Sequence, residues 1–96
     1  MKESILQTEK ACYICGNTLN LHKHHVFYGI ANRKLSDADG CVIWLCYSHH
    51  TGVRGIHQNK AVDNVVKRRM QRAWQEHYGK TKEDFIARYI RCPPYR

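Results

Sequence analysis

A ladder of cysteines and histidines in the first 60 residues constrains this chain more than any other feature. Two ligand pairs share the spacing ligand-x2-ligand, and their members are Cys12, Cys15, Cys46 and His49. Two side chains from one tight turn can reach a single ion, and two such turns supply the four ligands of a tetrahedral zinc site. We therefore expect a structural zinc ion, with His50 as an alternative to His49 for the fourth ligand.

The size and charge of the chain restrict the kinds of protein that it can be. Its 96 residues are expected to form a single domain, 1–96. The core of such a domain is modest and often needs additional stabilisation, for example by a bound metal ion. Sixteen Lys and Arg against eight Asp and Glu give a net charge of +8, which favours a polyanionic partner such as nucleic acid. No apolar run of about eighteen residues is present, so no membrane-spanning helix is expected.

The number of cysteines is evidence on the cellular compartment in which the protein resides. Five is an odd number, which fits thiols held by a metal inside the cell better than a framework of disulfides. The first residues also lack the apolar region of a signal peptide. We therefore expect cytoplasmic residence.

The pattern of residue types predicts an α+β fold. The segments 21–28 and 42–45 are rich in β-branched, aromatic and apolar residues and are predicted to be paired strands. Residues 29–40 between them have the composition of a loop and carry two adjacent cations. Residues 47–58 are expected to begin a short helix that is interrupted near Gly52 and Gly55, and the polar residues 1–10 predict a short helix or a frayed arm.

The C-terminal third carries a helical pattern. Between 61 and 78 apolar residues recur on one stripe, which contains Val62, Val65, Val66, Met70, Ala73, Trp74, His77 and Tyr78. The opposite side is expected to be either a solvated face or a DNA-binding face, and it carries Lys67, Arg68, Arg69 and Arg72. Gly79 predicts the end of this helix, and Thr81 with Asp84 resembles a capping box that opens a second helix to about residue 90.

These patterns divide the expected domain into a metal-binding core, 11–58, and a helical extension, 59–92, with Pro93 and Pro94 ending regular structure. The aromatic residues of the extension have the spacing of core residues rather than of residues that stack on nucleobases; they are Trp74, Tyr78, Phe85 and Tyr89.

The remaining histidines predict a second metal site. His24 lies on the first predicted strand and His50 on the helix that follows the second ligand pair, so the two can share a divalent ion. His57 lies about two helical turns beyond His50 and is a further candidate ligand, whose direction the intervening glycines leave open. His25 would then be free to act as a general base, because imidazole titrates near neutral pH. A bound metal and a base together are typical of phosphodiester hydrolysis.

Residues 12–57 resemble the HNH endonucleases, also called ββα-metal or His-Me finger nucleases, in their zinc-containing type. The two ligand pairs match the zinc ligands of that type, His24 and His50 match its catalytic metal ligands, and His25 matches its general base. The stretch 21–29, followed by 32–36, is similar to small phage or prophage HNH proteins, including those associated with recombination.

The resemblance implies a zinc-stapled ββα-metal core that hydrolyses DNA with a catalytic Mg²⁺, Mn²⁺, Ni²⁺ or Zn²⁺ ion. A phage protein of this kind would act in the cytoplasm of the bacterial host. Arginine and lysine mostly contact phosphates, and the candidates in the predicted loop and near the metal are Arg33, Lys34 and Arg54. The small size suggests a targeting partner protein or a homodimer.

Cys41 marks a departure from the family pattern, since it stands where an Asn helps to fix the base histidine. A thiol is a weak hydrogen-bonding group, so the backbone carbonyl near residue 41, Asp37 or Asp39 could orient His25 instead. Two alternatives to a DNA endonuclease follow. One is a non-catalytic zinc-binding module that binds nucleic acid, and the other is a toxin-like nuclease directed at RNA.

Overall fold

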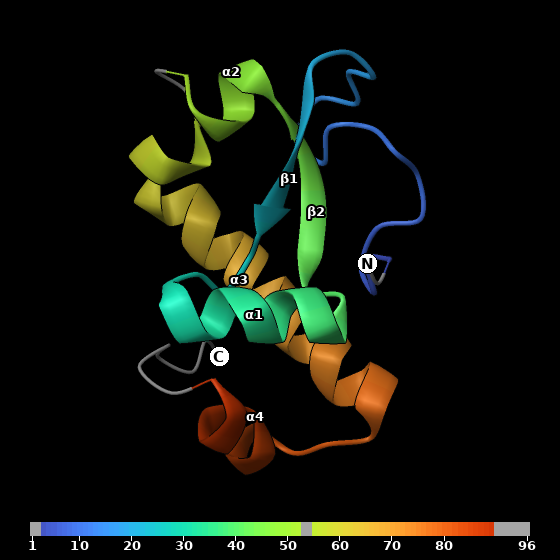
Figure 1. The fold of residues 1–96 in the computed structure, drawn as a ribbon, viewed down its shortest axis with the longest axis vertical. Coiled ribbons are helices and arrows are strands. Elements are labelled where there is room, and N and C mark those ends of the chain that lie inside the picture. Colours follow the sequence, from blue (N-terminus) through green and yellow to red (C-terminus); the bar gives the residue numbers. More distant parts are fainter. Residues whose placement is uncertain (1–2, 53–54, 90–96) are drawn as a thin grey trace.

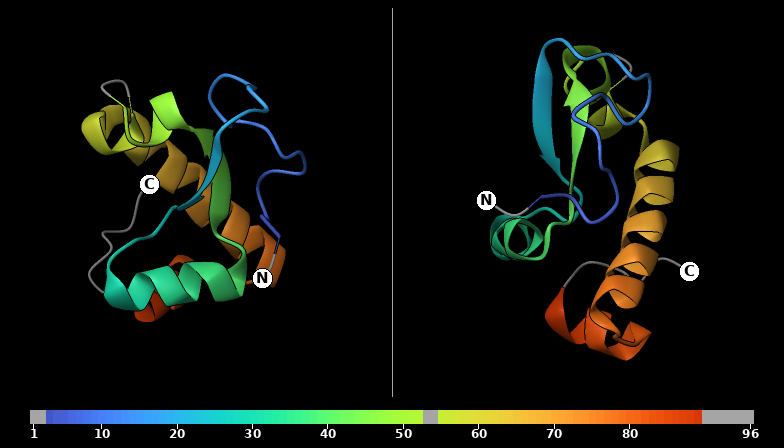
Figure 2. Two further views of the ribbon diagram at one scale, coloured as in Figure 1. Left: turned by 45° about the horizontal axis from the view of Figure 1, so that its top comes forward. Right: turned by 90° about the vertical axis from the view of Figure 1, so that its right-hand side faces the viewer.

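The computed structural model describes residues 3–52 and 55–89, which form a small α+β structure (Figure 1). Strands β1 (Leu21–His25) and β2 (Val42–Cys46) pair antiparallel, with His24 opposite Ile43. Helix α1 (Ile30–Asp39) connects them. After β2 come α2 (Tyr47–His50), the 3-10 helix η1 (Ile56–Gln58), α3 (Lys60–Tyr78) and α4 (Lys82–Arg88). The long helix α3 runs beside the two-stranded sheet, and α4 folds back at its end (Figure 2).

Helix α1 corrects the prediction of a loop at 29–40. Its inward face is polar, because the buried residues of its middle and end are Asn32, Ser36 and Asp39, at helical spacing. The Ser36 hydroxyl donates to the carbonyl oxygen of Phe27 at 2.7 Å. The segment does carry apolar residues at helical spacing, Ala31, Leu35 and Ala38, but its Gly, Asn, Ser and Asp residues have the composition of a loop, and the prediction followed that composition. Gly40 ends α1 at a φ of 79°, the left-handed conformation that favours glycine.

The paired strands are confirmed, although β1 ends at His25, three residues before the predicted end. The N-terminal arm contains no helix within residues 3–10. It is held along β2 instead, because the backbone N–H of Ile5 donates to Gly40, that of Tyr13 donates to the carbonyl of Trp44, and the N–H of Trp44 donates to the side chain of Gln7. These bonds satisfy backbone groups at the free edge of a two-stranded sheet.

The C-terminal helices follow the predicted pattern closely. Val66, Met70 and Trp74 of α3 are buried in the core that also contains Ile43 and Leu45 of β2. The αL conformation of Gly79 ends α3, and Thr81 and Asp84 form the predicted capping box of α4. Val65 and His77 are exposed rather than part of the buried stripe. The predicted end of regular structure at Pro93 and Pro94 lies outside the described residues.

Lys67 is buried, which corrects its placement on the solvent side of α3. Its ammonium group lies 3.2 Å from Asp63 Oδ2 and 4.2 Å from the centre of the Tyr28 ring. The Tyr28 hydroxyl donates to the same Asp63 oxygen at 2.9 Å. Charge alone predicted exposure, whereas pairing with a carboxylate four residues earlier and an aromatic face allows a lysine to be buried.

Asp39 joins α1 to both C-terminal helices. Its carboxylate accepts hydrogen bonds from Trp74 Nε1 at 2.9 Å, from the Tyr89 hydroxyl at 2.7 Å and from Arg88 Nη2 at 2.7 Å. Burial raises the pKa of Asp39, but the bonds from Arg88, Tyr89 and Trp74 outweigh it and hold the pKa below its usual range. The aromatic rings of Phe27, Trp74, Phe85 and Tyr89 pack against one another as core residues.

Replacing Trp74 by Ala should destabilise the fold by about 3–5 kcal/mol, because it removes a buried ring and one donor to the buried Asp39 carboxylate. Denaturant unfolding of both proteins measures this loss. Wild-type stability combined with lost nucleic-acid binding would contradict the assignment, because it would mean that Trp74 stacks on nucleobases.

Among the residues that the structure describes, no helix combines the length and the apolar character that crossing a membrane requires.

Candidate metal sites

The first cluster joins the two ligand pairs found in the sequence. Ligand atoms of Cys12, Cys15, Cys46 and His49 all lie within 4.8 Å of one another. Gly16, at a φ of 77°, turns the chain after Cys15, and the backbone N–H of Cys12 donates to the carbonyl of Asn17. Cys46 ends β2, and His49 follows three residues later in α2. The tight turn and the strand-to-helix junction therefore bring the four side chains together.

The separations between these ligand atoms fit a zinc ion. Cys15 Sγ lies 3.8 Å from Cys46 Sγ, and Nδ1 of His49 lies 3.7 Å from Cys12 Sγ and 3.2 Å from Cys46 Sγ. With Zn–S distances of about 2.3 Å and Zn–N distances of about 2.0 Å, a tetrahedron has S–S edges of about 3.8 Å and S–N edges of about 3.5 Å. A disulfide would bring two sulfurs to about 2.0 Å. The cluster could thus hold a metal ion such as zinc.

The protonation of Cys12 supports metal binding, since a thiolate is the form that coordinates a metal. Burial raises the pKa of this thiol, but hydrogen bonds from the backbone at Cys46, Cys15 and Ile14 outweigh it and lower the pKa to about 6. The structure also decides between the two candidates for the fourth ligand, because His49 belongs to this cluster and His50 to another.

The second cluster contains three histidines from three different elements. His24 of β1, His50 of α2 and His57 of η1 offer ligand atoms within 4.8 Å of one another. Their ring centres are 5.3 Å apart for His24 and His50, 5.2 Å for His24 and His57, and 5.1 Å for His50 and His57. His57, whose direction the sequence left open, therefore faces the other two. We call this cluster the histidine trio.

The trio has the donor chemistry of a divalent metal site. His24 is only 2% exposed, and its Nε2 has no hydrogen-bond partner among the described residues. Burial, together with the charges of His50 and His57, lowers the pKa of His24 to about 3, so the ring is neutral at neutral pH. A neutral imidazole with an unpartnered nitrogen is ready to coordinate a metal. Three histidine ligands also leave a further coordination position open.

His22 supports the trio from the side, a role that the sequence did not assign. Nδ1 of His22 lies 3.1 Å from Nδ1 of His50, so one of these atoms donates to the other. This bond occupies Nδ1 of His50 and leaves its Nε2 for a metal ion. Ligating histidines commonly bond through their second nitrogen in this way, which fixes the orientation of the ring. The signal in the sequence is the alternation His22-x-His24, which places both side chains on one face of β1.

His25 is not a member of the trio. Successive side chains of a strand point to opposite faces, so His25 is directed away from His24. Its Nε2 lies 2.9 Å from Oδ1 of Asp37 in α1. The His25 side chain is 14% exposed and that of Asp37 is 42% exposed, so the pair joins a largely buried imidazole to a partly exposed carboxylate. Among the residues that the structure describes, Asp37 is thus the one whose side chain bonds to His25.

The two other candidates for orienting His25 are engaged elsewhere. The carboxylate of Asp39 bonds with Trp74, Arg88 and Tyr89. The carbonyl of Cys41 accepts the backbone N–H of Val26 at 3.0 Å, and its buried thiol lies 3.4 Å from the Tyr89 hydroxyl. The thiol of Cys41 therefore belongs to the core.

The sequence did not reveal a polar group next to the trio, which joins the exposed Tyr28 to the buried residues Asp63 and Lys67. The Tyr28 ring lies 5.7 Å from that of His57 and 6.3 Å from that of His24, and Tyr28 bonds to the Asp63–Lys67 ion pair. Oδ1 of Asp63 is buried without a hydrogen-bond partner among the described residues. Asp63 and Lys67 are four residues apart on α3, a spacing typical of a helical ion pair that could have been noticed in the sequence.

The predicted nucleic-acid contacts are only partly described. Arg33 and Lys34 are exposed on α1, which places them on a helix rather than on a flexible loop. Arg54 lies outside the described residues.

Similarity to known proteins assigns no function to the chain, so a function has to be inferred from the geometry of the two clusters. No model of a known protein family, no curated protein and no solved structure matches the chain.

Proposed function

We propose that the protein is a metal-dependent endonuclease of the HNH type, which hydrolyses phosphodiester bonds in DNA. The observation that carries the proposal is the histidine trio, His24, His50 and His57, together with a fourth imidazole, that of His25, which follows His24 on β1 and contacts Asp37. Together they combine a metal-binding group and a base, the two functions that phosphodiester hydrolysis needs.

The arrangement of elements supports a ββα-metal core. The antiparallel strands β1 and β2 are followed directly by α2, and these elements carry His24 and His25 on β1 and His50 on α2. The cysteine-containing cluster lies at the junction of β2 and α2, so a zinc ion there would fix the start of the helix that presents His50. The zinc site would stabilise the fold, while the trio would take part in the reaction.

The bond to Asp37 assigns the chemical role of each nitrogen of His25. A carboxylate only accepts hydrogen bonds, so Nε2 of His25 carries the proton and donates to Asp37 Oδ1 at 2.9 Å. Nδ1 is then the basic nitrogen and accepts a proton from the water that attacks phosphorus. A divalent ion in the trio supplies the positive charge that stabilises the phosphate and the leaving oxygen.

The ligands of the trio narrow the choice of metal. Imidazole suits Zn²⁺ and Ni²⁺, whereas Mg²⁺ prefers oxygen ligands. No carboxylate belongs to the trio within residues 3–52 and 55–89. Of the ions expected from the sequence, Ni²⁺ and Zn²⁺ should therefore support activity at lower concentrations than Mg²⁺.

The net charge of +8 and the exposed cations Arg33 and Lys34 support a nucleic-acid substrate. The test is incubation of the zinc-loaded protein with single-stranded, duplex and branched DNA, and with RNA, in Mg²⁺, Mn²⁺ or Ni²⁺. Metal-dependent cleavage of DNA is expected. Cleavage of RNA alone would favour the RNA-directed nuclease. Binding without cleavage in every ion would favour the non-catalytic module, which the replacement of the family's Asn by Cys41 already suggests.

Replacing Asp37 by Ala should lower kcat by about 10–100-fold, since a hydrogen bond to a charged group contributes about 1.5–3 kcal/mol. KM and thermal stability should stay near the wild-type values, because the Asp37 side chain is partly exposed. Asp37→Asn keeps an oxygen that can accept from His25 and should recover part of the rate. Steady-state kinetics on one DNA substrate measures these values, and an unchanged kcat in Asp37→Ala would contradict the role of Asp37.

A further inference from the structure

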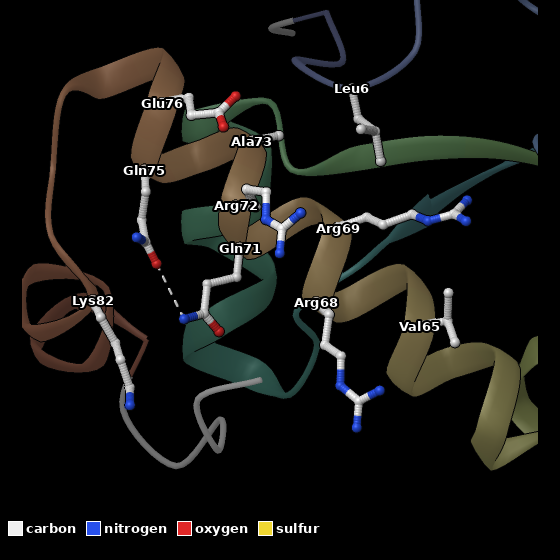
Figure 3. Close-up of a pocket in the computed structure, with 10 residues that line it drawn as sticks. All are labelled: Leu6, Val65, Arg68, Arg69, Gln71, Arg72, Ala73, Gln75, Glu76 and Lys82. Atoms are coloured by element: carbon white, nitrogen blue, oxygen red, sulfur yellow. Dashed lines mark hydrogen bonds between the residues drawn. The ribbon is translucent and has the colours of Figure 1, made fainter. Parts of the chain in front are cut away.

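A groove on α3 contains neither of the two metal-binding clusters. It has a volume of about 620 Å³ and lies where the N-terminal arm, α3 and the start of α4 meet. Its charged lining has four cations and one acid, which are Arg68, Arg69, Arg72, Lys82 and Glu76. The arginine side chains spread across the groove from successive turns of the helix (Figure 3).

The cations of this groove are largely unpaired. Each of the ion pairs found among the described residues involves other cations, so Arg68, Arg72 and Lys82 have no carboxylate partner there. Nη1 of Arg69 donates only to the neutral Tyr13 hydroxyl, at 3.4 Å. A guanidinium group has five donors in a planar fork that matches a phosphate, and these donors are left to a ligand.

The rest of the lining is apolar or neutral. Leu6, Val65 and Ala73 line the groove together with the arginines. Gln71 Nε2 donates to Gln75 Oε1 at 3.1 Å on the same helix, which adds a neutral polar pair. The groove therefore combines apolar lining with an excess of positive charge and a single carboxylate, Glu76.

We propose that this groove, whose lining includes neither His25 nor any residue of the trio, binds the sugar–phosphate backbone of nucleic acid. Arg68 and Arg72 are four residues apart, so their Cα atoms rise about 6 Å along the helix and lie on one face. The groove residues of α3, 65–76, extend about 17 Å, the length of about five base pairs at 3.4 Å each. The identity of the polyanion as DNA rests on the proposed function, whereas binding itself does not.

Contacts of this kind give affinity without sequence information. Loss of the groove should therefore weaken the binding of every DNA sequence about equally. It should raise KM for a long substrate and leave kcat unchanged, because the groove residues do not contact the trio or His25. A substrate that is too short to reach the groove should not respond.

The experiment compares two double variants with the same change in charge. Arg68→Gln with Arg72→Gln alters the groove, and Lys10→Gln with Lys80→Gln removes two exposed cations outside it. Binding of a labelled 25-base-pair duplex of random sequence is measured by fluorescence anisotropy, without added divalent metal, at several salt concentrations. Thermal unfolding of each variant checks that both are folded.

The groove variant should bind about tenfold or more weakly at low salt, and its slope of log K against log salt should be smaller by about two, one for each lost phosphate contact. The control variant should lose clearly less. Equal losses in both variants would show an effect of total charge alone and overturn the proposal, as would unchanged DNA binding. Unchanged DNA binding with lost binding of a polyglutamate peptide would assign the groove to an acidic polypeptide instead.

A different result would contradict the endonuclease proposal while leaving the groove proposal intact. Wild-type protein would then bind the duplex with the expected salt dependence but would not cleave it in any metal ion.

Discussion

Replacing Cys12 by Ser should unfold the protein under conditions in which the wild type is folded. Cys12 is buried, and its Sγ is one of four ligand atoms at the separations of a tetrahedral zinc site. Structural zinc contributes on the order of 10 kcal/mol to the folding of small metal-binding domains. A core of this size cannot offset such a loss, since whole domains are stable by only about 5–15 kcal/mol. Strong chelation of the wild-type protein should have the same effect.

Cys41 provides the matched control, because it is a buried cysteine that does not belong to the zinc cluster. Cys41→Ala should behave as an ordinary core substitution, with a loss of about 0.5–3 kcal/mol and no loss of zinc. Circular dichroism and metal analysis of the two variants and the wild type measure these outcomes. Well-folded wild-type protein that contains no zinc would contradict the role assigned to the cluster.

The cysteine-containing cluster and the C-terminal helices could be predicted because their signals are local. The spacing Cys12-x2-Cys15 and Cys46-x2-His49 places each pair on one turn whatever the rest of the fold does. The helix α3 buries three apolar residues at helical spacing, and its end and the start of α4 carry the usual glycine and capping box. In each case the residues that determine the structure lie within a few positions of one another.

The parts that the sequence missed depend on contacts between distant segments. The sequence predicts a loop in place of α1 because Gly, Asn, Ser and Asp dominate residues 29–40. The contacts that hold α1 involve Phe27, Trp74 and Tyr89, which lie outside the helix. Lys67 was expected on the surface because only the fold places Tyr28 over its ammonium group. For the same reason the sequence cannot decide whether Asp37 or Asp39 contacts His25. That choice depends on how α1 lies against β1 and α3.

His25→Ala should lower the rate of DNA cleavage by about 10²–10⁴-fold, the usual contribution of a general base. The variant should fold, keep its zinc and bind DNA as the wild type does. These properties should survive because His25 belongs to neither metal-binding cluster and its described side-chain partner is the partly exposed Asp37. Single-turnover kinetics, zinc analysis and a binding assay check the three properties. If His25→Ala cleaves as fast as the wild type, the base is another group, and His22 or His24 becomes the candidate.

The trio should respond differently from His25, because its members would hold the catalytic ion. His24→Ala and His50→Ala should weaken the binding of the second metal and lower the rate, while the zinc cluster stays intact. Part of the lost rate should return when the metal concentration is raised, since mass action refills a weakened site.

The measurement that tests the account most directly is a titration of DNA cleavage with Mn²⁺, carried out on the wild type, His24→Ala and His25→Ala. Mn²⁺ has a low affinity for thiolate ligands and should leave the zinc in place. We expect that the wild type cleaves, that His24→Ala needs more Mn²⁺ but recovers part of its rate, and that His25→Ala recovers at no concentration. Equal recovery of both variants would contradict the proposed function, as would cleavage by wild-type protein that holds one zinc ion, in the cysteine-containing cluster, and no other divalent ion.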